Sequence, residues 1–346
     1  MSPLQAPEEA GTGGGVSLSV VTPTFNRLRL LSRCLDALAA QSEPDFEVVV
    51  AVDGSTDGTL ALLTALAHAG SLNLKVLPLE RGGQAAARNA AIRAATGSVL
   101  VFVDDDLLLA PDALARHRAF HEVFERSVAI GGVRYERGTV FAPPSPTWVD
   151  FTGMNSSLPK ALAVEAGLFD ASLSGYGGED LEFALRLSKL GASFKALRGA
   201  WATHLGERVR DPDKGRSAGR QAVQVAARYG PAVAWRLGVH PTLLAAKRAL
   251  YNPVTAALAG RSRGYAWERA YQEGALEAQA ALDAERAAQA PDAAPGESGA
   301  AGREPAPPAA DRAAEPETAP TAAEPHAAPV AADAADPAAE GRSKEG

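Results

Sequence analysis

The chain has 346 residues, one cysteine, 46% hydrophobic and 22% charged residues, and a formal charge of −7. These values fit one large or two small globular domains, and they exclude a fibrous or fully disordered chain. The last 56 residues, 291–346, hold 11 of the 41 acidic and 4 of the 34 basic residues, which leaves 30 of each in the preceding part. The acidic balance therefore belongs to the tail and says little about the partners of the part that folds.

The two ends of the chain have compositions that cannot build a core. Residues 291–346 contain 10 of the 24 prolines and are otherwise rich in Ala, Glu, Asp and Thr, so we expect a disordered tail. Residues 1–15, rich in Gly, Pro and Glu, are expected to be a flexible N-terminus without a secretory signal. No apolar run approaches the roughly 18 residues of a membrane span. We expect a cytoplasmic protein, soluble or bound peripherally at the inner face of the membrane, and the single cysteine excludes an intramolecular disulfide.

From residue 17 onward, short β-branched runs alternate with longer Ala- and Leu-rich runs, which predicts repeated strand and helix units. The predicted strands are 17–22, 46–52, 74–79, 98–103, 128–135 and 200–203. The predicted helices are 28–38, 59–69, 84–95, 112–126, 159–166 and 180–190. Such units indicate an α/β fold with a mostly parallel central sheet flanked by helices. A helical C-terminal extension is predicted over 206–290.

Three adjacent aspartates, Asp104, Asp105 and Asp106, follow the fourth predicted strand. Ligands of open parallel sheets bind beyond the carboxyl ends of the strands, so this loop is a candidate site. Repulsion among adjacent carboxylates is relieved most simply by a divalent cation with oxygen ligands. Asp104 and Asp106 are expected to share one side, with Asp105 pointing away. The alternative interpretation is an ordinary acidic turn before the next helix.

Four further side chains are suited to catalysis or ligand binding. Glu179 and Asp180 follow two glycines at a helix start, where a carboxylate could act as a base toward a hydroxyl, although capping and the helix dipole favour acids there in any case. His204, which follows a predicted strand, is either a metal ligand or a structural histidine. Arg88, near the start of an alanine-rich helix, either binds a diphosphate or is a surface residue.

Some ligand classes are excluded by the motifs that the sequence lacks. It contains no Gly-x-x-x-x-Gly-Lys and no dinucleotide fingerprint after the first strand, and its two Gly-x-Ser-x-Gly matches, 215–219 and 260–264, lie in the predicted helical extension and do not follow a predicted strand. Dehydrogenases, P-loop NTPases and hydrolases with a nucleophile elbow are therefore poor fits.

Taken in order, the remaining motifs resemble the family 2 glycosyltransferases of the GT-A fold. The resemblance covers residues 16–204 and rests on collinear motifs at 20–27, 53–59, 86–92, 102–106, 153–156, 167–170 and 178–180. It implies a glycosyltransferase domain at 16–205 that transfers a sugar from a nucleotide-diphosphate sugar to an acceptor hydroxyl with inversion. The Gln-x-x-Arg-Trp signature of processive synthases is missing, so we expect one sugar per encounter.

The resemblance also implies roles for individual residues. The donor-binding residues would be Pro23, Thr24, Asp53, Arg88, Asp104 and Asp105. Asp106 and His204 would hold a Mg or Mn ion that bridges the two phosphates. Asp180, or alternatively Glu179, would take the proton from the acceptor hydroxyl.

Two other functions stay open from the sequence. A nucleotidyltransferase that forms sugar nucleotides would need a Gly-rich loop after the first strand, and residues 22–27 contain no glycine. A nucleotide-sugar-binding module without turnover is the non-enzymatic alternative.

The acceptor is expected to be a glycan or a lipid-linked molecule of polysaccharide or glycolipid biosynthesis. Residues 198–269 contain 13 basic and 4 acidic residues and three of the four tryptophans. This segment either contacts an anionic membrane surface or packs as helices over the catalytic domain. No nucleic acid is expected as a partner, because no recognised binding module accompanies the basic segment.

Overall fold

A computed structural model of the chain describes residues 15–136, 139–173, 175–206, 211–250, 255 and 263–289. The predicted tail, 291–346, and all but the last residue of the predicted N-terminal segment lie outside these residues. The described residues up to 277 form one compact unit, and of a second unit the structure describes 278–289. Among the helices described, none is both long and apolar enough to cross a membrane.

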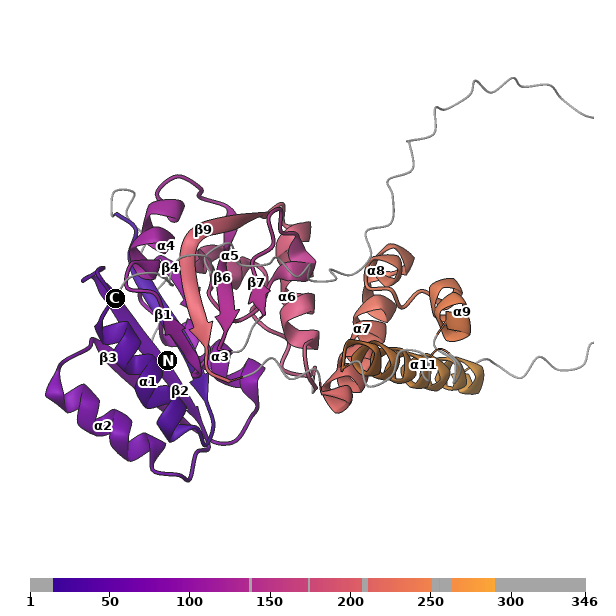
Figure 1. The fold of residues 1–346 in the computed structure, drawn as a ribbon, viewed down its shortest axis with the longest axis horizontal. Helices are drawn as coiled ribbons and strands as arrows, with labels where there is room; N and C mark the ends of the chain where they lie inside the picture. The colour runs from indigo at the N-terminus through magenta and orange to yellow at the C-terminus, as the bar shows by residue number, and fades with distance from the viewer. Residues whose placement is uncertain are drawn as a thin grey trace, which may run out of the picture. The chain divides into compact units, whose positions relative to one another are not determined.

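A mixed β-sheet forms the centre of the first unit (Figure 1). Its strands are β1 (Leu18–Thr24), β2 (Phe46–Asp53), β3 (Leu74–Leu79), β4 (Val99–Phe102), β5 (Leu107–Leu109), β6 (Ser127–Tyr135), β7 (Val140–Phe141), β8 (Ser156–Pro159) and β9 (Ser193–His204). Their order is β3-β2-β1-β4-β8-β6-β9-β5, and β7 pairs with β6. The strands β3, β2, β1 and β4 are parallel, as is the β6–β9 pair, whereas β8, β5 and β7 pair antiparallel with their neighbours.

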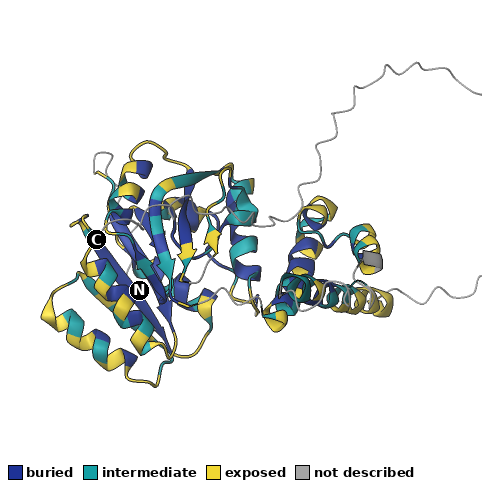
Figure 2. Ribbon diagram, in the orientation of Figure 1, coloured by how far each residue is buried: buried dark blue, intermediate teal, exposed yellow. Residues whose placement is uncertain are grey.

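Helices cover both faces of this sheet, which is why its central strands are almost continuously apolar. The helices are α1 (Leu28–Ala39), α2 (Thr59–Ala69), α3 (Gln84–Ala94), α4 (Ala113–His121), α5 (Lys160–Glu165) and α6 (Gly178–Lys189). Val21 of β1 belongs to an apolar cluster with α3, α5 and α6, whereas its neighbour Val20 belongs to a cluster with α1, α2 and α4. Figure 2 shows the buried strands between helices whose outer faces are exposed. The α/β fold expected from the sequence is confirmed.

Several element boundaries differ from the prediction. The short strands β5 and β8, of 3 and 4 residues, were not predicted, because so few residues give no readable periodicity. Strand β9 begins at Ser193 instead of residue 200, and its first half is only partly buried. Helix α4 ends at His121 instead of residue 126, although Phe124 N–H still donates to the carbonyl of Phe120.

Helices also make up most of the described C-terminal part of the chain. They are α7 (Pro212–Tyr229), α8 (Pro231–Arg236), α9 (Pro241–Leu250) and α11 (Arg263–Gln289). At Gly219 of α7 an added Cβ would lie 1.9 Å from the backbone oxygen of Tyr271, so α7 and the N-terminal part of α11 meet at backbone distance. Arg216 and Arg220 of α7 pair with Glu277. At least part of the positive charge of this segment therefore forms ion pairs between packed helices.

Glu47 of β2 is a buried carboxylate that links β2 to β1 and to the loop before β4. It accepts hydrogen bonds from the Ser19 hydroxyl of β1 (2.5 Å), from the Thr96 hydroxyl (2.8 Å) and from the backbone N–H of Gly97 (3.2 Å). Burial alone would raise the pKa of Glu47, but these hydrogen bonds outweigh burial and lower the pKa. Since the folded-state pKa lies below the unfolded one, the carboxylate stabilises the fold above the ordinary glutamate pKa.

Glu47→Gln is therefore expected to lower the free energy of unfolding at pH 7 by about 1 to 3 kcal/mol, because the neutral amide oxygen accepts these hydrogen bonds more weakly than the charged carboxylate oxygen does. The difference from the wild type should shrink as pH falls through the folded-state pKa of the carboxylate, since protonation removes the same interaction. Urea unfolding at pH 7 and at pH 3.5 measures both values, with the exposed Glu125→Gln as the matched control. A loss that is equal at the two pH values would contradict the role given to the charge.

Candidate active site

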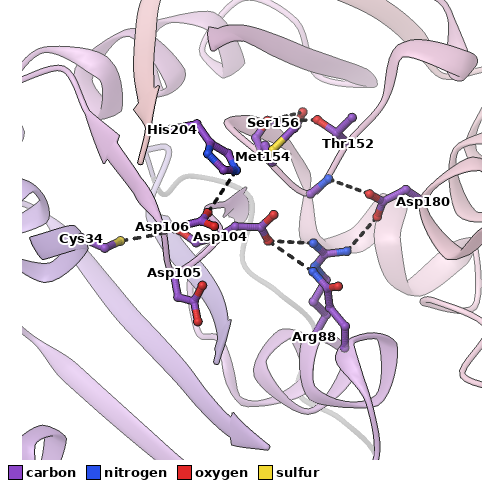
Figure 3. Close-up of polar contacts among 12 residues, drawn as sticks. Cys34, Arg88, Asp104, Asp105, Asp106, Thr152, Met154, Ser156, Asp180 and His204 are labelled. Atoms are coloured by element: carbon purple, nitrogen blue, oxygen red, sulfur yellow. Dashed lines mark hydrogen bonds and ion pairs between the residues drawn. The ribbon is translucent and has the colours of Figure 1, made fainter. Parts of the chain in front are cut away.

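The three aspartates that were predicted to form a ligand site, Asp104, Asp105 and Asp106, lie in the turn between β4 and β5. Strand β5 pairs antiparallel with β9, and the register places Leu107 opposite His204. The N–H of Leu205 donates to the backbone carbonyl of Asp106 (2.8 Å). This pairing brings His204 Nε2 to 3.6 Å from Asp106 Oδ1 (Figure 3).

Asp106 and His204 fit a divalent cation as two of its ligands. A carboxylate oxygen and an imidazole nitrogen 3.6 Å apart can bind the same ion. In the part of the chain that the structure describes, no group of three or more His, Cys, Asp or Glu side chains is arranged to hold a metal. The remaining ligands would have to come from substrate phosphates and water, as is usual for Mg²⁺.

Asp105 points away from Asp104 and Asp106, as the strand alternation predicted (Figure 3). It accepts hydrogen bonds from the Thr24 hydroxyl (2.7 Å) and from Arg27 Nη1 (2.9 Å). The same Arg27 nitrogen donates to Asp106 Oδ2 (2.6 Å). Arg27, which sequence reasoning did not single out, is thus the counter-ion of both acids, and its side chain is 46% exposed.

Arg88 of α3 joins the aspartate loop to the start of α6. Its Nη2 donates to Asp104 Oδ1 and its Nη1 to Asp180 Oδ1, each at 2.8 Å (Figure 3). The side chain is 2% exposed, and its Nε has no hydrogen-bond partner. The surface position considered for Arg88 is therefore wrong, because the guanidinium is buried between two acids.

The backbone at Gly153 completes the surroundings of this arginine. Gly153 N–H donates to Asp180 Oδ2 (3.1 Å), so both oxygens of this carboxylate have partners. A Cβ at Gly153 would lie 2.0 Å from Arg88 Nη2. Glycine is required here because the chain passes directly over the guanidinium. Gly153 belongs to a motif in the sequence, but nothing in the sequence indicates this contact.

Glu179, the residue before Asp180, is buried in a different way. Its side chain lies in the first turn of α6, it is 8% exposed, and its Oε2 has no hydrogen-bond partner. Burial, and next the negative charge of Asp180, raise the pKa of Glu179 to about 7. Glu179 is therefore able to carry a proton near neutral pH, beside a carboxylate that is paired with Arg88.

Cys34 of α1 lies beside the aspartate loop and donates a weak hydrogen bond to the carbonyl of Asp104 (3.7 Å) (Figure 3). Burial raises the pKa of the thiol, and the negative charges of Asp105, Asp106 and Asp104 raise it further. The thiol is a protonated donor that supports the loop and is not a nucleophile.

Asp53, at the end of β2, has a separate set of partners. Its carboxylate is 4% exposed and accepts hydrogen bonds from the N–H groups of Gly82 (2.6 Å) and Gly83 (3.0 Å) and from Arg81 Nη1. The guanidinium of Arg81 also lies 3.6 Å from the centre of the Phe25 ring. Sequence reasoning did not single out Arg81 or Phe25, although Phe25 lies within the motif at 20–27 and Arg81 lies in the loop before the motif at 86–92.

The structure thus brings the residues assigned from the sequence into three groups. Arg88 links Asp104 to Asp180 beside Glu179, Asp106 faces His204, and Asp105 binds Thr24. Pro23 and Thr24 are buried within β1, and Asp53 lies under Arg81. The roles given to these residues stay predictions.

Comparison with known proteins agrees with this arrangement. A mixed sheet with an acidic loop beyond a central strand is the architecture of the GT-A glycosyltransferases. Residues 19–167 match the model of glycosyl transferase family 2, so this part of the chain is similar to that family. The resemblance seen in the sequence motifs is confirmed.

Two relatives with assigned names are similar over parts of the chain. Validoxylamine A glucosyltransferase of Streptomyces hygroscopicus subsp. jinggangensis is 30% identical over 53% of this chain and 54% of its own length. Poly(ribitol-phosphate) beta-N-acetylglucosaminyltransferase TarS of Staphylococcus aureus is 38% identical over 30% of this chain and 19% of its own. The chain spans about half the length of the first of these relatives and less of the second.

A solved structure is similar over a larger part of the chain. The mannosyltransferase PcManGT from Pyrobaculum calidifontis, in complex with GDP-Man and Mn²⁺, superposes with a TM-score of 0.51 and 23% identity. The match covers 79% of this chain and 87% of that one. At this identity the likeness supports the fold.

The raised pKa of Glu179 predicts how the free energy of unfolding changes with pH. Because the folded-state value, about 7, lies above the ordinary value of 4.5, the wild type loses stability as pH rises from about 4.5 to 7. The amide of the Glu179→Gln variant cannot ionise, so the variant keeps its stability over this pH range. The variant should be more stable than the wild type at pH 8, by about 1 to 3 kcal/mol, and should equal it at pH 4. Chemical unfolding at the two pH values tests this, and a variant less stable at pH 8 would contradict the assignment.

Proposed function

We propose that this protein is a metal-dependent, inverting glycosyltransferase that moves one sugar from a nucleotide-diphosphate sugar to an acceptor hydroxyl. The observation that carries the proposal is the arrangement around Arg88. One buried guanidinium contacts an acid of the donor loop, Asp104, and the candidate base, Asp180, each at 2.8 Å. The donor and the acceptor would therefore meet at this side chain.

Asp106 and His204 are the proposed ligands of a Mg or Mn ion. Such an ion supplies positive charge that offsets the charge on the departing nucleoside diphosphate. The Mn²⁺ named with PcManGT supports this assignment, as does the 3.6 Å separation of the two side chains. Asp104 and Asp105 would orient the donor from the same loop, with Pro23, Thr24 and Asp53 toward the nucleoside.

Asp180 is the proposed base. In a single displacement the acceptor oxygen attacks the face of the sugar opposite the leaving group, and a carboxylate on that side accepts its proton. Arg88 and Gly153 N–H hold the Asp180 carboxylate in one orientation, as a base must be held to meet the hydroxyl at hydrogen-bond distance. Glu179 can accept the proton in turn, since its pKa is raised to about 7. Arg88 is assigned to positioning the acids, in place of direct contact with the donor phosphates.

The acceptor is proposed only as a hydroxyl of a glycan or a lipid-linked molecule, in glycan or cell-envelope polysaccharide biosynthesis. The names of the relatives refer to different acceptors, validoxylamine A and poly(ribitol phosphate). Action in the cytoplasm, with peripheral contact at the inner face of the membrane, is part of this proposal. The half-exposed Trp235 of α8, which is followed by the basic residue Arg236, supports such a contact.

The metal assignment is tested by binding. Asp106→Ala and His204→Ala should each weaken the Mn²⁺-dependent binding of nucleoside diphosphate at least about tenfold, because each removes a metal ligand. Calorimetric titration with a panel of nucleoside diphosphates, with and without Mn²⁺, gives this value. Asp112→Ala, an exposed acid paired with Arg116, is the matched control and should bind as the wild type does. Unchanged affinity in both site variants would refute the metal site, and failure of every nucleotide to bind the wild type would refute the proposed function.

The base assignment is tested by separating binding from transfer. Asp180→Asn keeps the side-chain volume but cannot accept the hydroxyl proton, so sugar transfer should fall by about 10²- to 10⁴-fold. Nucleoside diphosphate affinity should stay within about threefold of the wild type, because the donor loop is intact. The rate of sugar transfer is measured from the release of nucleoside diphosphate when donor and acceptor are both present. Calorimetry measures the nucleoside diphosphate affinity. Full activity in the variant would exclude Asp180 as the base.

A further inference from the structure

The candidate base, Asp180, lies in the first turn of a helix whose own residues do little to fix its start. Helix α6 begins at Gly178, Gly177 is its N-cap residue, and no side chain caps it. Glycine has more backbone freedom than any other residue, and a polar side chain at the N-cap is the usual means of holding a first turn. The backbone of Asp180 therefore depends on contacts from outside α6.

Helix α7 supplies contacts of this kind. The Ser217 hydroxyl accepts a hydrogen bond from the backbone N–H of Tyr176 (2.9 Å). A Cβ at Gly178 would lie 2.7 Å from Cβ of Gln221, and a Cβ at Gly175 would lie 2.6 Å from Gln221 Nε2. Ser217 and Gln221 are four residues apart, so they lie on the same face of α7. The start of α6 packs directly against this face.

A second contact joins the other end of α7 to the second turn of α6. The Tyr229 hydroxyl donates to Oε1 of Glu182 (2.5 Å), and the same carboxylate pairs with Arg186 (2.6 Å). Arg186 also donates to the backbone carbonyls of Ala166 and Leu168. Helix α7 is therefore connected to α6 at two levels, and through α6 to the turn after α5.

These contacts explain the two glycines at the start of α6. Glycines at a helix start can let the backbone approach a ligand closely. At Gly177 the angle φ is +81°, a conformation that favours glycine, and an added Cβ would have nothing within 4 Å. At Gly178 an added Cβ would collide with Gln221. Gly178 is thus required for the close approach of α7.

We propose that α7 is part of the catalytic unit, and that Ser217 and Gln221 are positioning residues that hold the first turn of α6, and with it Asp180, in place. The inference rests on the proposed function, because it takes Asp180 as the base. Neither the family match, 19–167, nor the domain predicted over 16–205 includes α7. A base displaced by about 1 Å can lose up to about 10²-fold in rate.

Ser217→Ala removes the acceptor of the Tyr176 N–H and tests the first contact. Release of nucleoside diphosphate from UDP-glucose or GDP-mannose, with Mn²⁺ and with water in place of the acceptor, should fall about three- to tenfold. The affinity for UDP and GDP should stay within about twofold, because the donor loop is intact. Ser217→Thr keeps the hydroxyl and should keep the rate. Gln224→Ala, on the exposed face of α7, is the matched control.

Gly178→Ala tests the second contact. The added methyl group meets Gln221, so the same release rate should fall at least about tenfold. Gln221→Gly opens the space again, and the double variant should therefore be at least about threefold faster than Gly178→Ala alone. A loss caused by blocking a ligand would not recover, because the change at Gln221 opens space only on the side of α7.

Amide hydrogen exchange reports on the start of α6 without any substrate. In Ser217→Ala the amides of Tyr176 and of residues 181–183 should exchange about three- to tenfold faster than in the wild type, because one hydrogen bond that holds this turn is lost. The amides of the central β-sheet should exchange as in the wild type.

Four results would overturn the inference. They are a wild-type release rate in Ser217→Ala, a parallel loss of UDP and GDP affinity in that variant, no recovery in the double variant, and unchanged exchange at residues 176 and 181–183. If the wild type binds neither nucleotide and releases none from either donor, the proposed function fails instead. The exchange comparison then still decides whether α7 holds the start of α6.

Discussion

The site depends on one buried arginine held between two acids. Burying the Arg88 guanidinium is costly unless charged partners surround it, and Asp104 and Asp180 provide them at 2.8 Å each. These acids come from the end of β4 and the start of α6, and the chain at Gly153 passes close enough to exclude a side chain. Arg88 therefore fixes the relative positions of three segments that are far apart in the sequence.

Each acidic group of the site has its own arginine, and the arginines differ in exposure. Arg88 is 2% exposed, whereas Arg27 beside Asp105 and Asp106 is 46% exposed and Arg81 beside Asp53 is 54% exposed. The buried ion pairs can act as a permanent frame. The exposed ones are weaker and can exchange for a ligand, since solvent screens them and their side chains can rotate.

The sequence predicted the parallel half of the sheet because three of its four strands, β1, β2 and β4, are buried on both faces and read as almost unbroken apolar runs. The short strand β5 has no such pattern, and its pairing with β9 brings His204 to Asp106. The proximity of these two residues was therefore available only through the family resemblance. Arg88 was placed near the helix start correctly, but its burial depends on Gly153 and Asp180. Arg27 and Arg81 gave no signal, because loop contacts made across 28 or more residues place them.

A crystal structure of the protein with Mn²⁺ and the nucleoside diphosphate that it binds tests the central claim most directly. The account predicts an anomalous manganese peak within bonding distance of Asp106 and His204. It also predicts that Arg88 still contacts both Asp104 and Asp180, since the buried frame does not move when the donor arrives. A manganese ion bound elsewhere, or Arg88 turned to the diphosphate with Asp180 released, would contradict the account.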